Sequence, residues 1–260
     1  MSKPDLSSLP ITAFEDVSTL SARRTARWRP GLAAVQGAAS HSEVFASSRE
    51  GAGVGAALAL ALDDWRHIPR EDGREVEDRR SVLWVQTRDA ARLNGRPYRA
   101  GLPDELQGRL IHVLADKAGD ALFALEEGLR CRDFAFVIGE MTGNAKALDF
   151  TASRRLTLAS ERHGVQLFLI RIDAAHDLSS ARMRWEVTSA PSPAPQWNAQ
   201  APGDPAWRAE LFRARSHAPG EWLLKSTPKT LEATKASERT DRTVANWTAG
   251  LRHRRPPLRA

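Results

Sequence analysis

A short loop rich in small residues is the first place in this chain where chemistry could be expected. Residues 48–55 (SREGAGVG) align with the phosphate-loop pattern G-x-x-x-x-G-K-[ST]. In that pattern, backbone amides and the Lys hold phosphates, while the hydroxyl binds magnesium. Val54 stands at the Lys position and Gly55 at the Ser/Thr position, and no Lys occurs from Pro4 to Asp116. We therefore predict a Gly-bearing turn before an Ala-rich helix, with no ATP hydrolysis.

An acidic residue that could assist such a loop is also displaced. The apolar run ending at Ile138 is followed by Gly139 and Glu140, so a carboxylate lies one residue late. Arg49 is the basic residue of the loop. A divergent ATPase could use Arg49 in place of Lys, but a guanidinium is not the compact point charge that an ammonium provides.

Other catalytic or metal-binding groups are scattered. The chain has no G-x-S-x-G segment, and its single cysteine, Cys131, excludes an intramolecular disulfide and favours the cytosol. His112 alternates with apolar neighbours and is expected to be a hydrogen-bonded core residue. Glu126 and Glu127 are expected on the solvent side of a helix. We predict no catalytic, metal-binding or cofactor-binding residue. The histidines are His41, His67, His112, His163, His176, His217 and His253.

The elements that would position these residues alternate between strands and helices. Apolar runs predict strands at 42–46, 81–86, 109–114, 134–138 and 165–172. Helical spacing of Ala and Leu predicts helices at 56–66, 116–130 and 147–163, the last ending at Gly164. The segment 87–107 is mixed, with turns. Strands that alternate with helices of this length predict a mainly parallel α/β sheet with right-handed crossovers.

The pattern changes after Asp173. Segments 182–188, 207–215 and 221–224 alternate polar and apolar residues, which is typical of half-exposed strands. The turn at 216–220 joins two of them, so we expect an antiparallel hairpin that extends the sheet. Trp185, Trp207 and Trp222 fall on these strands, where packing is the expected role.

Length and charge define three regions. We predict a poorly ordered or helical segment at 1–41, one α/β domain at 42–225 and a basic, disordered tail at 226–260. The net charge of +6 lies in the tail, because residues 225–260 hold nine Lys or Arg and three Asp or Glu. Arg252, Arg254, Arg255 and Arg259 are the candidate binding residues, either for DNA or for an acidic partner. A solubilising tail is the alternative.

The longest low-polarity run, 51–62, is too short to span a membrane.

Several segments together resemble the ImuA family, in its alphaproteobacterial form. They cover roughly residues 42–225, and they are scaffold motifs, not catalytic ones. The segments are 58–62 with Asp64 and Trp65, 69–74, 80–86, 120–130 leading to 137–140, 147–156, 181–185 and 207–215.

This resemblance implies a RecA-like core with a degenerate nucleotide site and no cofactor. It implies a damage-induced (SOS) accessory subunit of an error-prone translesion synthesis complex. The implied partners are an ImuB-type relative of Y-family polymerases and an error-prone replicative-type DNA polymerase. RecA is a further candidate partner, and the charge of the tail adds DNA. The implied location is the cytoplasm, at the nucleoid. The sequence departs from RecA at Val54, Gly55 and Gly139. A SulA-like inhibitor of a cytoskeletal GTPase and a divergent RecA-like ATPase are the alternatives.

Overall fold

A computed structural model describes residues 39–67, 78–195, 197–198, 200–215 and 218–236. Most of the predicted N-terminal segment 1–41, two of the histidines (His217 and His253) and the four tail arginines lie outside these ranges. Everything below concerns the described residues.

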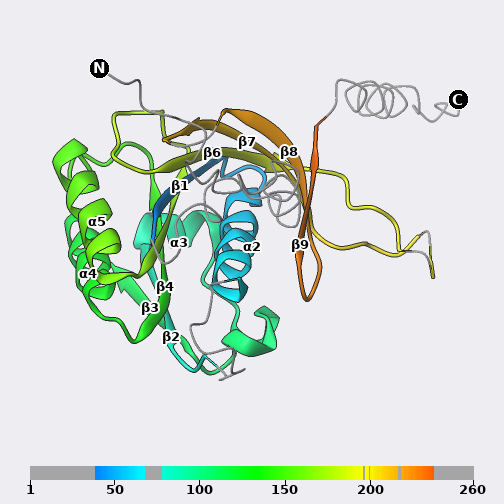
Figure 1. The fold of residues 1–260 in the computed structure, drawn as a ribbon, viewed down its shortest axis with the longest axis horizontal. Helices are drawn as coiled ribbons and strands as arrows, with labels where there is room; N and C mark the ends of the chain where they lie inside the picture. Colours follow the sequence, from blue (N-terminus) through cyan, green and yellow to red (C-terminus); the bar gives the residue numbers. More distant parts are fainter. Residues whose placement is uncertain (1–38, 68–77, 196, 199, 216–217, 237–260) are drawn as a thin grey trace, which may run out of the picture.

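One nine-stranded sheet organises the described chain (Figure 1). The strand order is β3-β2-β4-β5-β1-β6-β7-β8-β9. From β3 to β6 all neighbours are parallel, and from β6 to β9 they are antiparallel. The prediction of a mainly parallel α/β sheet with an antiparallel extension is therefore confirmed. The strands are β1 (His41–Ala46), β2 (Ser81–Thr87), β3 (Leu110–Ala115), β4 (Phe134–Thr142), β5 (Gln166–Ile172), β6 (Met183–Ser189), β7 (Ala206–Ala214), β8 (Gly220–Ser226) and β9 (Leu231–Lys235).

Helices cover both faces of the parallel part of the sheet. The helices are α2 (Ala52–Arg66), α3 (Arg88–Asn94), α4 (Ala118–Arg130) and α5 (Phe150–His163). In Figure 1, α4 and α5 lie side by side on one face and α2 lies on the other. The direction of the crossovers explains this division. The chain passes from β1 to β2 in one direction along the sheet and from β3 through β4 to β5 in the other, so right-handed crossovers place α2 opposite α4 and α5.

The central strands supply both halves of the core. Phe136 and Ile138 of β4 pack in the cluster beneath α2, whereas Val137 packs in the cluster beneath α4 and α5. All three side chains are fully buried. Strand residues point alternately to the two faces, so a strand between two helix layers must be apolar throughout. The continuous apolar run at 134–138 was the sequence signal for this position.

Side-chain caps define two helix starts. Asp149 Oδ1 accepts a hydrogen bond from Ala152 N at the start of α5, and Thr87 Oγ1 accepts one from Ala90 N at the start of α3. Gly164 ends α5 in the left-handed conformation, with a φ of 74°, as predicted. The sequence did not identify α3, because its seven residues carry a single buried side chain, Ala90, and hence no apolar stripe.

Three of the differences from the predicted boundaries bear on the candidate site or on the domain end. Helix α2 begins at Ala52 instead of Ala56, so two glycines of the supposed loop lie inside a helix. Strand β4 continues to Thr142, so Glu140 is a strand residue. The sheet also continues past residue 225, because β9 pairs with β8. The predicted domain end at 225 is too early. Polar residues dominate β9, and the burial of Leu231 alone carries little periodic signal.

Candidate functional site

The carboxyl edge of the parallel strands is the place where an open α/β sheet normally binds a ligand. Binding occurs where the outgoing connections of neighbouring strands diverge. Here the loop from Ser47 to Gly51 follows β1, Asp173 follows β5, and Gly143 follows β4. Strand β1 leads away to β2 on one side, whereas β5 leads across β1 to β6 on the other. The segment 48–55, which was compared with the phosphate-loop pattern, therefore lies at a topological switch point.

A carboxylate already occupies the loop after β1. Ser48 N donates a hydrogen bond to Asp173 Oδ1 at 3.0 Å, and Asp173 N donates to Ala46 O at 3.0 Å. The Ser48 hydroxyl and its backbone amide hold the pKa of Asp173 below its usual range, so the group is an anion. Asp173 has a φ of 49°, in the left-handed region that Asp tolerates better than most residues. A bound phosphate would meet a negative charge here instead of a free amide.

A second carboxylate ties the same loop to the antiparallel strands. Glu50 Oε2 accepts a hydrogen bond from Ser189 N at 2.8 Å, at the end of β6. Within the loop, Arg49 N donates to Ser47 Oγ at 3.2 Å. The Glu50 carboxylate and the Arg49 amide of the loop therefore both have hydrogen-bond partners within the protein.

The glycines of the supposed phosphate loop have a packing role. A Cβ on Gly53 would lie 2.6 Å from Ala46 Cβ, and a Cβ on Gly55 would lie 2.9 Å from the Trp207 ring. Real Cβ atoms do not approach so closely. Because both glycines are inside α2, they allow the helix to lie directly against β1 and the β7 tryptophan. Close approach of backbone to its neighbours accounts for their presence without a phosphate.

Glu140 is the buried acid of the neighbouring strand, and its carboxylate is fully engaged. Trp84 Nε1 and Gln86 Nε2 donate to Oε2 at 3.3 and 2.9 Å, and Asn94 Nδ2 donates to Oε1 at 3.0 Å. Burial raises the pKa of Glu140, and the three hydrogen bonds oppose this rise. An acid held by three donors at fixed geometry is suited to joining α3 to the sheet.

A cavity of about 220 Å³ opens above Glu140. Val54 and Leu58 of α2 form one wall, and the segment from Asn94 to Tyr98 forms the other. Among its lining residues the cavity has one buried carboxyl, that of Glu140, together with Arg96 and Tyr98, and no histidine. The polar side chains that line it are thus a carboxyl, a guanidinium, a phenol and the Asn94 amide.

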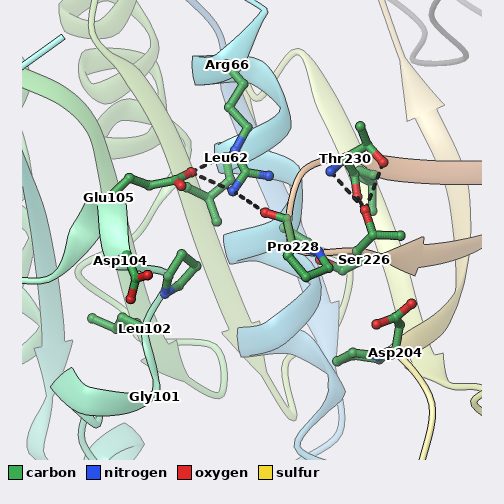
Figure 2. Close-up of a pocket in the computed structure, with 15 residues that line it drawn as sticks. Leu62, Arg66, Gly101, Leu102, Asp104, Glu105, Asp204, Ser226, Pro228 and Thr230 are labelled. Carbon is green, nitrogen blue, oxygen red and sulfur yellow. Dashed lines mark hydrogen bonds and ion pairs between the residues drawn. The ribbon is translucent and has the colours of Figure 1, made fainter. Parts of the chain in front are cut away.

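A larger groove of about 430 Å³ lies between α2, the segment 101–105 and the β8–β9 turn (Figure 2). Arg66 bridges its upper end. Arg66 Nε donates to Glu105 Oε1 at 2.7 Å, and Arg66 Nη2 donates to Pro228 O at 3.2 Å. Three segments distant in the sequence thus form one concave surface.

A buried ionic layer lies on the α5 side of the sheet, and sequence reasoning missed it. Glu43 Oε2 accepts from Arg184 Nε at 2.7 Å, and Glu43 Oε1 lies 3.6 Å from Arg171 Nη1. Asp177 Oδ2 accepts from Arg171 Nη2 at 3.2 Å. Two carboxylates therefore balance two guanidinium groups. Nearby, burial lowers the pKa of His41 to about 4, so its ring is neutral. The sequence did contain a signal for this layer, because Glu43 and Arg171 are charged residues inside apolar strand segments.

The groups considered as possible chemistry in the sequence are dispersed in the structure. His112 lies on the edge strand β3 and is half-buried, so its assignment to the core is wrong; Nε2 is 3.2 Å from Gln86 Oε1. Glu126 is largely shielded and, like Glu127, pairs with Arg130. Cys131 is half-buried and free. Trp185 and Trp207 pack in the core, as expected. No group of three or more His, Cys, Asp or Glu within the described ranges could hold a metal ion.

None of the helices in the described part of the chain combines the length and the apolar character that crossing a bilayer requires.

Comparison with known proteins identifies one kind of relative. No family model matches the chain. The chain is 33% identical, over an alignment of 168 residues, to the protein named ImuA in each of two strains of Caulobacter vibrioides. The alignment covers 59% of this chain and 64% of each relative, so the chain spans less than two thirds of their length. This similarity confirms the resemblance to the ImuA family.

Proposed function

We propose that this relative of ImuA is a non-catalytic, RecA-like accessory subunit of an error-prone translesion synthesis complex induced by DNA damage. Its partner would be an ImuB-type homologue of Y-family polymerases, acting with an error-prone replicative-type polymerase. The similarity to ImuA is the observation that carries this proposal. The proposed location is the cytoplasm, at the nucleoid, and RecA is a further candidate partner.

The geometry of the switch point supports a binding role over an enzymatic one. The anionic carboxylate of Asp173 accepts a hydrogen bond from the backbone amide of Ser48, and the loop has no Lys. The two helix glycines are accounted for by close packing. Glu140 is held by three hydrogen-bond donors. These contacts internal to the protein support the proposal of a scaffold over that of a nucleotide-hydrolysing enzyme.

The basic tail supports a second contact of the complex. The tail carries no Asp or Glu after Asp241. Its last part holds four arginines: Arg252, Arg254, Arg255 and Arg259. Such a segment attracts DNA phosphates without sequence preference, and the attraction falls steeply with salt. An acidic face of the polymerase partner is the other candidate target.

Co-expression with the ImuB-type protein from the same genome tests the partner assignment. A stable complex on size-exclusion chromatography is expected. The proposal would be contradicted if the two folded proteins failed to co-elute. Filamentous cells on overexpression of this chain alone would then favour the SulA-like alternative.

Complementation tests the absence of catalysis. In a deletion strain, the wild-type gene and an Arg49→Ala variant are expected to restore damage-induced mutation to the same level, because Arg49 is the only basic residue of the loop. ATP turnover by the purified chain that disappears in Arg49→Ala would instead identify a divergent ATPase.

A further inference from the structure

We propose that the groove between α2 and the β8–β9 turn binds the basic C-terminal segment of the same chain, residues 237–260. The contact would be internal to the chain, and it does not depend on the identity of the polymerase partner. The groove is concave and has a volume of about 430 Å³ (Figure 2).

Apolar side chains from three segments form part of the groove surface. Leu62 comes from α2, Leu102 from the segment after α3, and Leu231 from the start of β9. Pro205 and Pro228 add to this surface. Apolar area of this kind suits the leucine, proline or tryptophan side chains of an extended peptide, which would otherwise stay in water.

Carboxylates stand on both walls of the groove. Asp104 and Glu105 lie on one side of α2, and Asp204 lies on the side of the hairpin (Figure 2). Arg66 is the one cation among the lining residues, and Glu105 and Pro228 O already engage it. The lining residues therefore carry three negative charges and one positive charge.

The two wall aspartates are weakly compensated. Asp104 Oδ1 accepts a hydrogen bond from Gln107 Nε2 at 3.1 Å and makes no ion pair with the described residues. Asp204 lies 3.4 Å from Lys225 Nζ, and both side chains are at least one third exposed. Ion pairs this exposed contribute little, so each aspartate can accept a new cation. Neither Lys225 nor Lys229 of the hairpin lines the groove.

The C-terminal segment has the complementary composition. Residues 237–260 contain six Arg and two acids, with Trp247, Leu251 and Leu258 among them. A guanidinium can bind a carboxylate through two parallel hydrogen bonds, which makes Arg the stronger partner for an aspartate wall. The arginines from Arg252 to Arg259 are interspersed with a leucine and two prolines that match the apolar surface.

The segment starts within reach of the groove. Leu231 lines the groove, and β9 ends four residues later at Lys235, a rise of roughly 13 Å. Arg252 follows Ala236 by 16 residues. A random-coil chain of that length would span roughly 22 Å on average. When the linker length matches the distance, the effective concentration of the tethered group is on the order of millimolar. Binding within one chain is therefore favoured over binding between chains.

Competition with a labelled peptide tests this contact in the full-length chain. The probe is a fluorescent peptide of residues 246–260, and binding is followed by anisotropy. The tail-neutral chain carries Arg252→Ser, Arg254→Ser, Arg255→Ser and Arg259→Ser, which should leave the groove vacant. We expect the peptide to bind this chain roughly tenfold or more tightly than the wild type, whose own tail competes at high effective concentration.

A charge-matched pair of variants locates the binding site. Asp104→Asn with Asp204→Asn, placed in the tail-neutral chain, should weaken peptide binding by roughly fivefold, as expected for two exposed ion pairs. Asp120→Asn with Asp133→Asn removes two exposed carboxylates outside the groove and should leave binding unchanged. Equal peptide affinity of the wild-type and tail-neutral chains, or equal losses from the two variant pairs, would overturn the proposal. A wild-type dimer that the tail-neutral substitutions dissociate would also overturn it, because the groove would then hold the tail of a second copy.

Discussion

Glu43 shows how one residue on a central strand can fix its surroundings. The carboxylate contacts Arg184, Ser179 and Arg171, and its side chain is fully buried. Removal of its charge would leave two buried guanidinium groups with a single shared carboxylate, that of Asp177. A buried charge left without its partner costs several kcal/mol.

We therefore expect Glu43→Gln to lower the free energy of unfolding by about 3 kcal/mol or more. Urea denaturation followed by circular dichroism would measure the change. Glu186→Gln is the matched control on the exposed part of the same sheet face, where the effect should stay within about 0.5 kcal/mol. Similar losses in the two variants would show that the buried ionic layer is not a strong determinant of stability.

His41 should give the stability a specific pH dependence. Burial lowers the pKa of its folded form to about 4, whereas the ordinary value is 6.5. The unfolded chain therefore binds a proton more readily than the folded chain between these values. Stability from the neutral ring is fully present above pH 6.5 and is lost as the pH falls toward 4, with a total on the order of 3 kcal/mol.

The measurement is the free energy of unfolding between pH 7.5 and 4.5, on buffers of constant ionic strength. His41→Gln should flatten the decline, even if the variant is less stable at neutral pH. A slope identical to that of the wild type would mean that His41 does not titrate differently in the folded and unfolded states.

At the scale of elements, α2 depends on a close approach to β1. A methyl group on Gly53 would collide with Ala46, whose Cβ belongs to a fully buried strand and cannot move freely. Gly53→Ala should therefore destabilise the fold by about 1–3 kcal/mol, as overpacking usually does. Gly119→Ala, in α4, meets no atom within 4 Å and should stabilise the fold by about 0.5–1 kcal/mol through helix propensity. The two melting temperatures should move in opposite directions. A parallel shift would remove the packing explanation for the loop glycines.

Strand β4 is the element on which both halves of the core rest. Ile138 is fully buried beneath α2, so Ile138→Asp would place an unpaired carboxylate between helix and sheet. The variant is expected not to fold, because such burial costs several kcal/mol against a total stability of about 5–15 kcal/mol. Phe123→Asp, on the exposed side of α4, should fold normally. A soluble Ile138→Asp chain with the melting temperature of the wild type would contradict the role given to β4.

For the whole molecule, the position of the domain boundary is testable by truncation. A chain that ends at Ala236 keeps β9, whereas a chain that ends at Lys225 loses it and exposes buried Leu224. We expect the first truncation to leave the melting temperature nearly unchanged. The second should lower it by several degrees, since each kcal/mol corresponds to roughly 2–4 °C in a domain of this size. Equal melting temperatures would restore the boundary at 225 and show that β9 contributes nothing to the fold.

The sequence by itself determined the class of fold and the family resemblance. Alternation of apolar runs with helical stripes predicted α4, β4, α5 and β5 in their correct order, because each must bury a face that its own periodicity reveals. The strands β6, β7 and β8 after Asp173 were predicted for the same reason, whereas β9 was not. The segments quoted for the ImuA family that the structure describes lie mainly on α2, β2, α4, β4, α5, β6 and β7, whereas 69–74 lies outside the described ranges. The similarity to ImuA confirmed the resemblance.

Only the tertiary structure decided what the polar residues do. The carboxylate of Asp173 meets the amide of Ser48 across 125 positions of sequence, and Glu43 meets Arg184 across 141. Local periodicity carries no information about such pairs, because strand order alone makes β5 and β6 the neighbours of β1. The same holds for the groove, whose walls come from α2, the segment after α3 and the last hairpin. Burial patterns are local and can be read from the chain, whereas charge pairing depends on contacts that form only when distant segments pack together.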